Sequence, residues 1–210
     1  MILLNKCPLC SNKNLVKKLN CIDHTTSKEE FIIVSCETCD FTFTNPRPQD
    51  DLLAGYYKSN MYISHTNSNK GLFSWMYQKV RKYAIGTKLS LLKNVTTFGC
   101  HLDIGCGTGE FLNACEKAGF KTEGVEPAKL ARDQAINNYA LSVSKDTNLD
   151  QFQDGAFDSI SMWHVLEHVP NLTKTIADLK RILNKNGKAI IAVPNYKSWD
   201  STYYREAWAA

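Results

Sequence analysis

The sequence predicts an α/β protein with a doubly wound, mostly parallel sheet and a small cysteine-rich domain at its amino terminus. From residue 98 onward, short apolar runs alternate with helix-like stretches, which is the order that βαβ units produce. Two Cys-x-x-Cys pairs lie within the first 39 residues, apart from that alternation. Together the two patterns indicate a larger α/β domain that follows a small metal-binding one.

Composition divides the 210 residues into three segments. Residues 1–48 hold the cysteine pairs and a β-like run, EEFIIVSC, and end in NPRP, whose two prolines favour an extended linker. Residues 49–96 are expected to be a linker that becomes helical, because GLFSWMYQKVRKYAIGTKLSLL spaces its apolar residues three and four positions apart. Residues 97–210 are expected to form the α/β core.

The core segment contains five candidate strands with helices between them. The strands are HLDIG, KTEGVEP, ALSVS, FDSISMW and KAIIAVP. The helical stretches are EFLNACEKAG, AKLARDQAINNYA and NLTKTIADLKRILNKNG. Helices that separate successive strands in this way favour parallel pairing.

The overall charge excludes few partners. The formal net charge of +4 is mild and gives no argument for nucleic acid. No apolar run has the length of a membrane span, and MILLNKCP lacks the layout of a signal peptide. We therefore expect a cytoplasmic protein without membrane contact, whose eight cysteines are thiols or metal ligands rather than disulfides.

The two cysteine pairs predict a structural zinc site. Each Cys-x-x-Cys turn offers two thiolates, and two such turns supply the four ligands of a closed tetrahedral centre of the zinc-ribbon kind. A closed site stabilises a small domain rather than performing chemistry. The alternative is a set of free or redox-active thiols. The expected ligands are Cys7, Cys10, Cys36 and Cys39.

The stretch HLDIGCGTGEF predicts a ligand-binding loop, because it places three glycines between a strand and a helix. A phosphate-binding P-loop requires a Lys-Ser or Lys-Thr pair that is absent here. The dinucleotide pattern GxGxxG has its last glycine one position later. The third candidate ligand, S-adenosylmethionine, carries no phosphate and requires acidic groups close to the loop.

Two acidic residues fit that third ligand. Asp103 lies two positions before the first glycine and is expected to face the methionyl ammonium. Glu126, in GVEP at the end of the next strand, is expected to accept hydrogen bonds from the ribose hydroxyls. Pro127 is expected in the first turn of the following helix. Alternatively, Asp103 is a turn residue and Glu126 a favourable charge at a helix start.

Three motifs in order, LDIGCGTGEFL, GVEP and FDSISMWHVLEHV, resemble the class I S-adenosylmethionine-dependent methyltransferases over residues 98–195. The resemblance implies a Rossmann-like sheet in which the glycine loop surrounds the methionyl group and residues 144–147 lie against the adenine. It also places the residues after FDSISM near the reacting methyl group. The expected cofactor-binding residues are Asp103, Gly105, Cys106, Gly107, Thr108, Gly109, Glu126, Pro127, Lys145, Asp146, Trp163, His164 and Tyr62.

The stretch HVLEH also matches HxxEH, a pattern of some zinc proteases. We reject that interpretation because FDSISMW before it has the pattern of a strand and Pro170 ends any helix just beyond. His164 is instead a candidate general base in a loop at the active site, with no chemical role as the alternative. His168 is expected to cap or pack.

The acceptor of the methyl group is harder to predict, because methyl transfer requires alignment rather than a fixed set of catalytic residues. Tyr62 and His65, in YYKSNMYISH, are candidates for the acceptor side, with ordinary packing as the alternative. The cysteine pairs make the chain similar to sugar and small-molecule methyltransferases with an amino-terminal zinc domain. The alternatives are a zinc-finger ribosomal RNA methyltransferase and an inactive zinc-ribbon binding module.

The resemblance also implies two further antiparallel strands after KAIIAVP, for which about fifteen residues leave no room. The chain is therefore expected to be a carboxyl-terminally truncated member of the family. An uncovered AIIAV strand is an adhesive sheet edge. We expect this edge to pair with a second copy in a homodimer, or residues 196–210 to fold over it.

Overall fold

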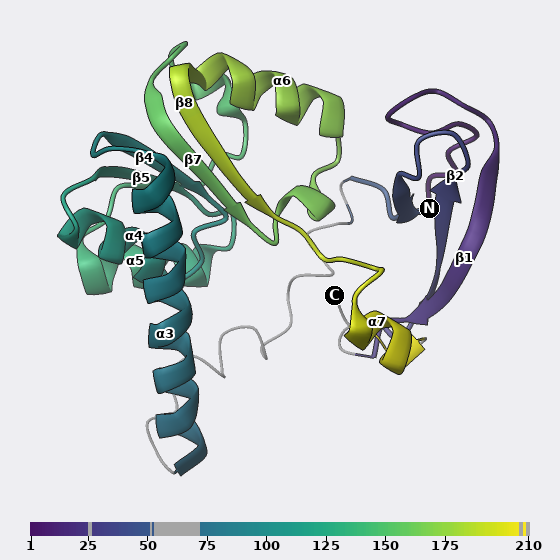
Figure 1. Cartoon of the computed structure of the whole chain (residues 1–210), viewed down its shortest axis with the longest axis horizontal. Coiled ribbons are helices and arrows are strands. Elements are labelled where there is room, and N and C mark those ends of the chain that lie inside the picture. Colours follow the sequence, from purple (N-terminus) through teal and green to yellow (C-terminus); the bar gives the residue numbers. More distant parts are fainter. Residues whose placement is uncertain (25–26, 51, 53–71, 206–207, 209–210) are drawn as a thin grey trace. The chain divides into compact units, whose positions relative to one another are not determined.

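The computed structural model of the chain describes residues 1–24, 27–50, 52, 72–205 and 208 (Figure 1). It divides into two compact units, of which the first combines residues 1–66 with 194–210 and the second contains residues 67–193. Each unit has a sheet of its own.

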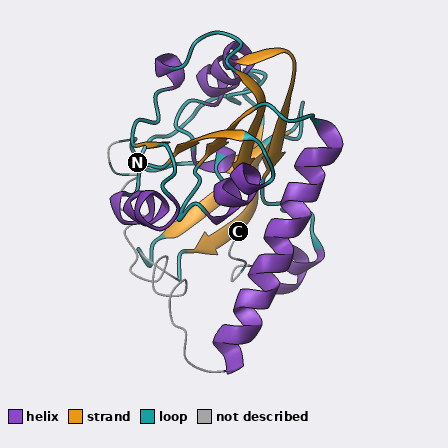
Figure 2. Cartoon of the chain, turned by 90° about the vertical axis from the view of Figure 1, so that its left-hand side faces the viewer, coloured by secondary structure: helices purple, strands orange, loops and turns teal. Residues whose placement is uncertain are grey.

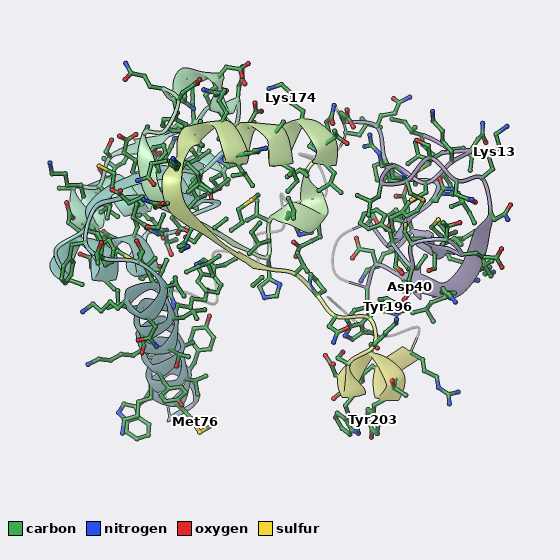
Figure 3. All side chains as sticks on the ribbon, turned by 45° about the horizontal axis from the view of Figure 1, so that its top comes forward. Lys13, Asp40, Met76, Lys174, Tyr196 and Tyr203 are labelled. Carbon is green, nitrogen blue, oxygen red and sulfur yellow. The ribbon has the colours of Figure 1, made fainter. Side chains whose placement is uncertain are left out.

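The first unit contains a three-stranded antiparallel sheet and a short helix near the carboxyl terminus. The elements are β1 (Leu15–Ile22), β2 (Glu30–Cys36), β3 (Thr42–Thr44) and α7 (Trp199–Tyr204). Asp40, in the turn before β3, accepts a hydrogen bond of 3.2 Å from the Tyr196 hydroxyl and pairs with Lys197 (Figure 3). The segment before α7 is thus bonded to the turn that follows the second cysteine pair.

The second unit contains a five-stranded parallel sheet in the order β6-β5-β4-β7-β8. The strands are β4 (Cys100–Ile104), β5 (Lys121–Val125), β6 (Val143–Ser144), β7 (Phe157–Trp163) and β8 (Leu183–Ala192). The helices are α3 (Leu72–Val95), α4 (Glu110–Lys117), α5 (Lys129–Tyr139) and α6 (Leu172–Ile182), with single 3₁₀ turns at η1 (Leu149–Gln151) and η2 (Leu166–His168). Figure 2 shows these strands with α3 alongside them. The prediction of a doubly wound α/β fold is confirmed.

The strand order reverses between β4 and β7, and the side chains of these two strands alternate between unlike faces. Leu102 and Ile160 belong to an apolar cluster with Ile182 of α6. On the other face, the His101 ring contacts the rings of Phe111 in α4 and Phe120, with centroids 5.8 and 6.1 Å apart. Helices therefore cover both faces, and the loop after β4 lies at the switch point, where doubly wound sheets bind ligands.

The expected helix before the core is α3, but only its second half packs an apolar face against the core. Trp75, Met76 and Val80 are more than half exposed, and Figure 3 shows Met76 at the end of the helix. The inward face of its second half carries Ile85, Leu89 and Leu92, which pack in an apolar cluster, together with half-buried Arg81. The apolar spacing therefore marks the packed side only in the second half of the helix. Even α3, the longest helix described, lacks the apolar length needed to cross a membrane, as do the other described helices.

Among the described strands, only β7 pairs with β8. Strand β8 begins at Leu183, directly after α6, and its regular pairing with β7 runs from Lys188 to Ala192. The pairing of this edge with a second copy stays a prediction.

Candidate cofactor site and cysteine cluster

The glycine loop depends on residues without a side chain. Gly105 and Gly109 have φ values of 74° and 82°, in the left-handed region that side chains disfavour. A Cβ on Gly105 would lie 2.4 Å from a methyl carbon of Val165. One on Gly109 would lie 2.8 Å from the Cβ of Ala135 and 3.2 Å from its Cα. The loop is therefore packed against the chain after β7 and against α5.

Glu126 follows β5 and holds two backbone segments together. Its carboxylate accepts hydrogen bonds of 2.8 Å from the N–H of Gly107 and of 2.8 Å from the N–H of Ala128. Glu126 is 5% exposed, so its charge depends on these two donors. The carboxylate therefore lies where the glycine loop meets the start of α5.

Asp103 lies at the end of β4 and is 2% exposed. The Ser161 hydroxyl donates a hydrogen bond of 2.5 Å to its Oδ1. Burial raises the pKa of Asp103 to about 7, while Ser161 and the charge of Lys88 oppose the rise and Glu126 adds to it. The group therefore changes charge near neutral pH.

Two positive side chains of α3 reach this region, and the sequence interpretation missed both. Arg81 pairs with Glu110 and donates a hydrogen bond of 3.1 Å to the Thr108 hydroxyl, which in turn donates to Glu110 over 2.6 Å. Lys88 lies seven residues further along the same helix, on the same face. The signal in the sequence was this spacing of two cations ahead of the glycine loop.

Lys88 lies over an aromatic ring, and its charge interacts with that of Asp103 without forming an ion pair. Its Nζ lies 4.5 Å from the ring centroid of Trp163, at the end of β7. Burial lowers the pKa of Lys88, and the charge of Asp103 opposes the change. The described residues give it no ion pair within 4.0 Å. Trp163 packs edge-on against Phe111, and its ring nitrogen is buried without a hydrogen-bond partner in the described part of the chain.

The other predicted cofactor residues lie at the same edge of the sheet. The backbone N–H of Cys106 donates to the Val125 carbonyl over 3.2 Å, and burial raises the pKa of its thiol. Lys145 and Asp146 are exposed in the turn after β6. The position expected for Pro127 was wrong, because α5 begins at Lys129 and the proline precedes its cap.

His164 follows β7 directly and has a left-handed backbone, with φ of 57°. Its Nδ1 lies 3.5 Å from Oε1 of Glu167, and the same oxygen lies 3.9 Å from Nε2 of His168. Burial lowers the pKa of His168, and Glu167 opposes the change. The stretch from His164 to His168 is a strand end followed by a 3₁₀ turn rather than a continuous helix. The two histidines therefore do not share the helix face that the zinc-protease pattern needs. Tyr62 and His65 lie outside the described residues.

The four predicted cysteines of the first unit come together. Their sulfur atoms all lie within 4.8 Å of one another, with Cys7–Cys39 and Cys10–Cys36 at 3.7 and 3.5 Å. Thiolates 2.3 Å from a shared tetrahedral zinc lie about 3.8 Å apart, so the arrangement fits this ion. The N–H of Leu9 points at the Cys7 sulfur over 3.4 Å, as in a metal knuckle.

The thiols of the cluster shift one another's ionisation in opposite directions. Burial opposes deprotonation of Cys36, but backbone N–H groups of Cys39 and Thr38 and the neighbouring thiols favour it, and its pKa falls to about 7. A backbone hydrogen bond at Phe41 favours deprotonation of Cys39, but burial and the neighbouring thiols raise the pKa of Cys39 to about 12. Among the described residues, no other group of three or more His, Cys, Asp or Glu side chains is close enough to hold a metal ion.

Comparison with known sequences places the chain in a family. The profile of the family described as "Methyltransferase domain" matches residues 75–210, and the chain belongs to this family. It is 30% identical over 105 residues to a ubiquinone biosynthesis O-methyltransferase of Haemophilus ducreyi, covering 45% of this chain and 44% of that protein. It is likewise 30% identical over 115 residues to a sterol 4-C-methyltransferase of Caenorhabditis elegans, covering 51% of this chain and 33% of that protein. The chain thus spans less than half the length of these curated relatives.

Solved structures give the same fold. A SAM-dependent methyltransferase of Archaeoglobus fulgidus matches with a TM-score of 0.53 and 22% identity over 63% of each chain. A Thermotoga maritima protein described as a SAM-dependent methyltransferase, possibly a histamine N-methyltransferase, matches with a TM-score of 0.50 and 25% identity over 63% of each chain.

Proposed function

We propose that the chain binds S-adenosylmethionine and transfers its methyl group to a small-molecule acceptor, such as a nucleotide-linked sugar or another metabolite. The observation that carries this proposal is a pair of buried carboxylates, Asp103 and Glu126, on either side of a glycine loop at the switch point of the sheet. Asp103 suits the methionyl ammonium, and Glu126 suits the two ribose hydroxyls.

Lys88 completes the charge pattern for the methionyl group. An amino acid is a zwitterion, and a half-buried ammonium close to a buried carboxylate offers both opposite charges. Lys88 lies over the Trp163 ring, at the strand end where the reacting methyl is expected. We therefore assign the methionyl carboxylate to Lys88 and the methionyl ammonium to Asp103.

The chemistry asks little of the protein beyond alignment. The methyl carbon moves from the sulfonium to the acceptor, the carbon–sulfur bond breaks, and the sulfur leaves as a neutral thioether that requires no acid. An acceptor hydroxyl or ammonium must lose a proton. His164 is the proposed proton acceptor, and Glu167 beside its Nδ1 fixes the ring so that Nε2 accepts the proton.

The cysteine cluster of the first unit is proposed to hold a structural zinc ion. The four sulfur donors saturate tetrahedral coordination, which leaves no position for a substrate. The ion would therefore stabilise β1 to β3 rather than participate in methyl transfer.

Cofactor binding is tested by calorimetry with two ligands. S-adenosylhomocysteine carries the amino-acid group, and 5′-deoxy-5′-methylthioadenosine lacks it. Lys88→Met should weaken S-adenosylhomocysteine about tenfold and leave methylthioadenosine unchanged, because only the first ligand presents a carboxylate. Lys82→Met, at an exposed position of the same helix, is the matched control. No binding of S-adenosylhomocysteine to the wild-type chain would refute the proposal.

The acceptor is tested by transfer of a labelled methyl group from S-adenosylmethionine. Nucleotide-linked sugars and small hydroxylated metabolites form one arm, and ribosomal RNA forms the other. Label on a small molecule supports the proposal. Label on RNA would support the RNA methyltransferase alternative, and cofactor binding without transfer to either arm would favour a binding module.

A further inference from the structure

Four polar side chains form a continuous chain inside the second unit, between β4 and β7. The two strands pair His101 with Ser159 and Asp103 with Ser161. His101, Ser159 and Ser161 are fully buried. His101 Nδ1 lies 2.8 Å from the Ser159 hydroxyl, and its Nε2 lies 3.1 Å from the Ser161 hydroxyl. Ser161 then reaches Oδ1 of Asp103 over 2.5 Å.

The carboxylate gives this chain a direction. An ionised Asp103 only accepts hydrogen bonds, so the Ser161 hydroxyl must donate to it. The Ser161 oxygen then accepts a hydrogen bond from the Nε2–H of His101. A neutral imidazole has one N–H, so Nδ1 accepts from the Ser159 hydroxyl. Burial lowers the pKa of His101 to about 4, so the ring is neutral under ordinary conditions.

The packing around His101 does not require this row of hydrogen-bonded side chains. The rings of Phe111 and Phe120 surround His101 on the same face, and an apolar side chain there would leave no polar atom to satisfy. Backbone pairing already holds β4 to β7. What the polar chain adds is a fixed donor at Oδ1 of Asp103, while the described residues leave Oδ2 without a hydrogen-bond partner.

We infer that His101 and Ser161 are positioning residues for the cofactor: they fix the Asp103 carboxylate as an oriented acceptor whose Oδ2 faces the methionyl ammonium. The inference rests on the proposed function. When Oδ1 of Asp103 takes up a proton from solvent, the direction of the hydrogen bonds reverses: Asp103 donates to Ser161, Ser161 donates to Nε2 of His101, and the imidazole N–H lies at Nδ1. Ligands with an ammonium therefore select one tautomer of a buried histidine.

The charge state of Asp103 sets the pH range of this selection. The titratable groups around it are Lys88 on α3, Glu126 after β5, Cys106 in the loop, Cys115 on α4 and His101. Burial raises the pKa of both thiols, to about 12 for Cys115, so neither thiol changes charge near pH 7. Asp103 is the group whose ionisation falls between pH 6 and 8.

Calorimetry on two matched serine variants of the full chain tests the inference. Ser161→Ala removes the donor to Asp103, and Ser159→Ala makes the same change at the far end of the chain. Wild-type affinity for S-adenosylhomocysteine should rise about tenfold from pH 6 to pH 8, with no such rise for methylthioadenosine. Ser161→Ala should lower the affinity for S-adenosylhomocysteine about tenfold at pH 7. It should also raise the midpoint, the pH at which the affinity reaches half its maximum. Ser159→Ala should change affinity less than about threefold and leave the midpoint in place.

Nitrogen NMR of His101 supplies a readout that needs no variant. The ring should hold its proton on Nε2 when S-adenosylhomocysteine is bound, and on Nδ1 at pH 5.5 without ligand. Equal losses in both serine variants, equal losses for both ligands, or an unchanged tautomer would overturn the inference. Wild-type binding of S-adenosylhomocysteine in those same experiments separates this outcome from a failure of the proposed function.

Discussion

The two candidate ligand sites differ in which atoms face the ligand: side-chain sulfurs in the first unit, and mainly backbone in the second. In the first unit, four cysteine side chains supply every donor atom, and the backbone only aims them. In the second unit, the loop from Gly105 to Gly109 presents backbone, and side chains enter from neighbouring strands and from α3. The first site therefore joins two short turns, at residues 7–10 and 36–39, whereas the second requires α3, the glycine loop and the ends of β5 and β7 to come together.

This difference predicts which unit depends on its ligand. The described part of the first unit buries few large apolar side chains, among them Val34, so a metal ion would supply much of its stability. The second unit has three clusters of buried apolar side chains, which contribute stability of their own. The second unit should therefore stay folded when its cofactor is absent, and the cofactor should change only which conformation of the folded unit is favoured.

Cys36→Ser makes the largest expected change. A chain with an intact cluster should contain about one zinc ion, and the variant should lose it together with the cooperative unfolding of the first unit. Released zinc measured with a colorimetric chelator, and the thermal unfolding profile, check this outcome. Cys21→Ser is the control, because Cys21 lies outside the cluster. Retention of zinc by the Cys36 variant would contradict the four-thiolate site.

Asp103→Asn tests how strongly the stability of the second unit depends on pH. The pKa of Asp103 is raised to about 7 in the folded state, so folding favours its protonated form. Its contribution to stability is present below the unfolded pKa and is lost as pH rises toward 7. The unfolding free energy of the wild type relative to the variant should fall by about 4 kcal/mol between pH 4 and pH 8. Urea titrations at both pH values measure this, and a constant difference would argue that Asp103 is ionised throughout.

Gly109→Ala tests how tightly the loop is packed. An alanine there would adopt a left-handed backbone that side chains disfavour, and its Cβ would lie too close to Ala135. We expect a loss of about 3 kcal/mol in unfolding free energy. Gly86→Ala is the control, because Gly86 lies in α3 with nothing within 4 Å of the added carbon. The unfolding free energy of that variant, measured by chemical denaturation, should rise by about 1 kcal/mol. Equal effects in the two variants would mean that the loop is not close-packed.

Arg81→Met gives the smallest expected effect. It removes the ion pair with Glu110 and the hydrogen bond to Thr108, and both paired side chains are about a quarter exposed. We expect a loss of about 1 kcal/mol in unfolding free energy, which moderate salt should reduce. Lys82→Met again serves as the control. A loss that is insensitive to salt would assign the effect to packing of the arginine stem.

The sequence was enough to predict most elements of the second unit and most side chains at its candidate site, although β8 begins at Leu183, inside the stretch NLTKTIADLKRILNKNG that was expected to be helical. Strands alternate with helices in HLDIG to KAIIAVP, and the glycines, Asp103 and Glu126 stand at strand ends where parallel sheets bring side chains together. Cysteine spacing was equally informative, because each pair forms a local turn. These predictions depend on neighbours along the chain.

The missed features depend on neighbours in space. The apolar residues near the start of α3 are exposed and those of its second half pack against α4, so the inward direction of Arg81 and Lys88 follows from that packing. The link from His101 to Ser161 requires the register of β4 against β7. The start of α5 lies beyond Pro127, because Glu126 accepts from the Ala128 N–H and so occupies the turn before the helix.

The serines of β7 have a further consequence for anyone who would redesign this chain. A central parallel strand is normally filled with branched apolar residues, yet here two hydroxyls occupy its interior. An algorithm that optimises stability alone would replace Ser159, Ser161 and His101 with valine, leucine or phenylalanine and would rank the result higher. Such a sequence would fold more firmly and lose the orientation of its cofactor-facing acid, so these three positions should be held fixed during any stabilisation.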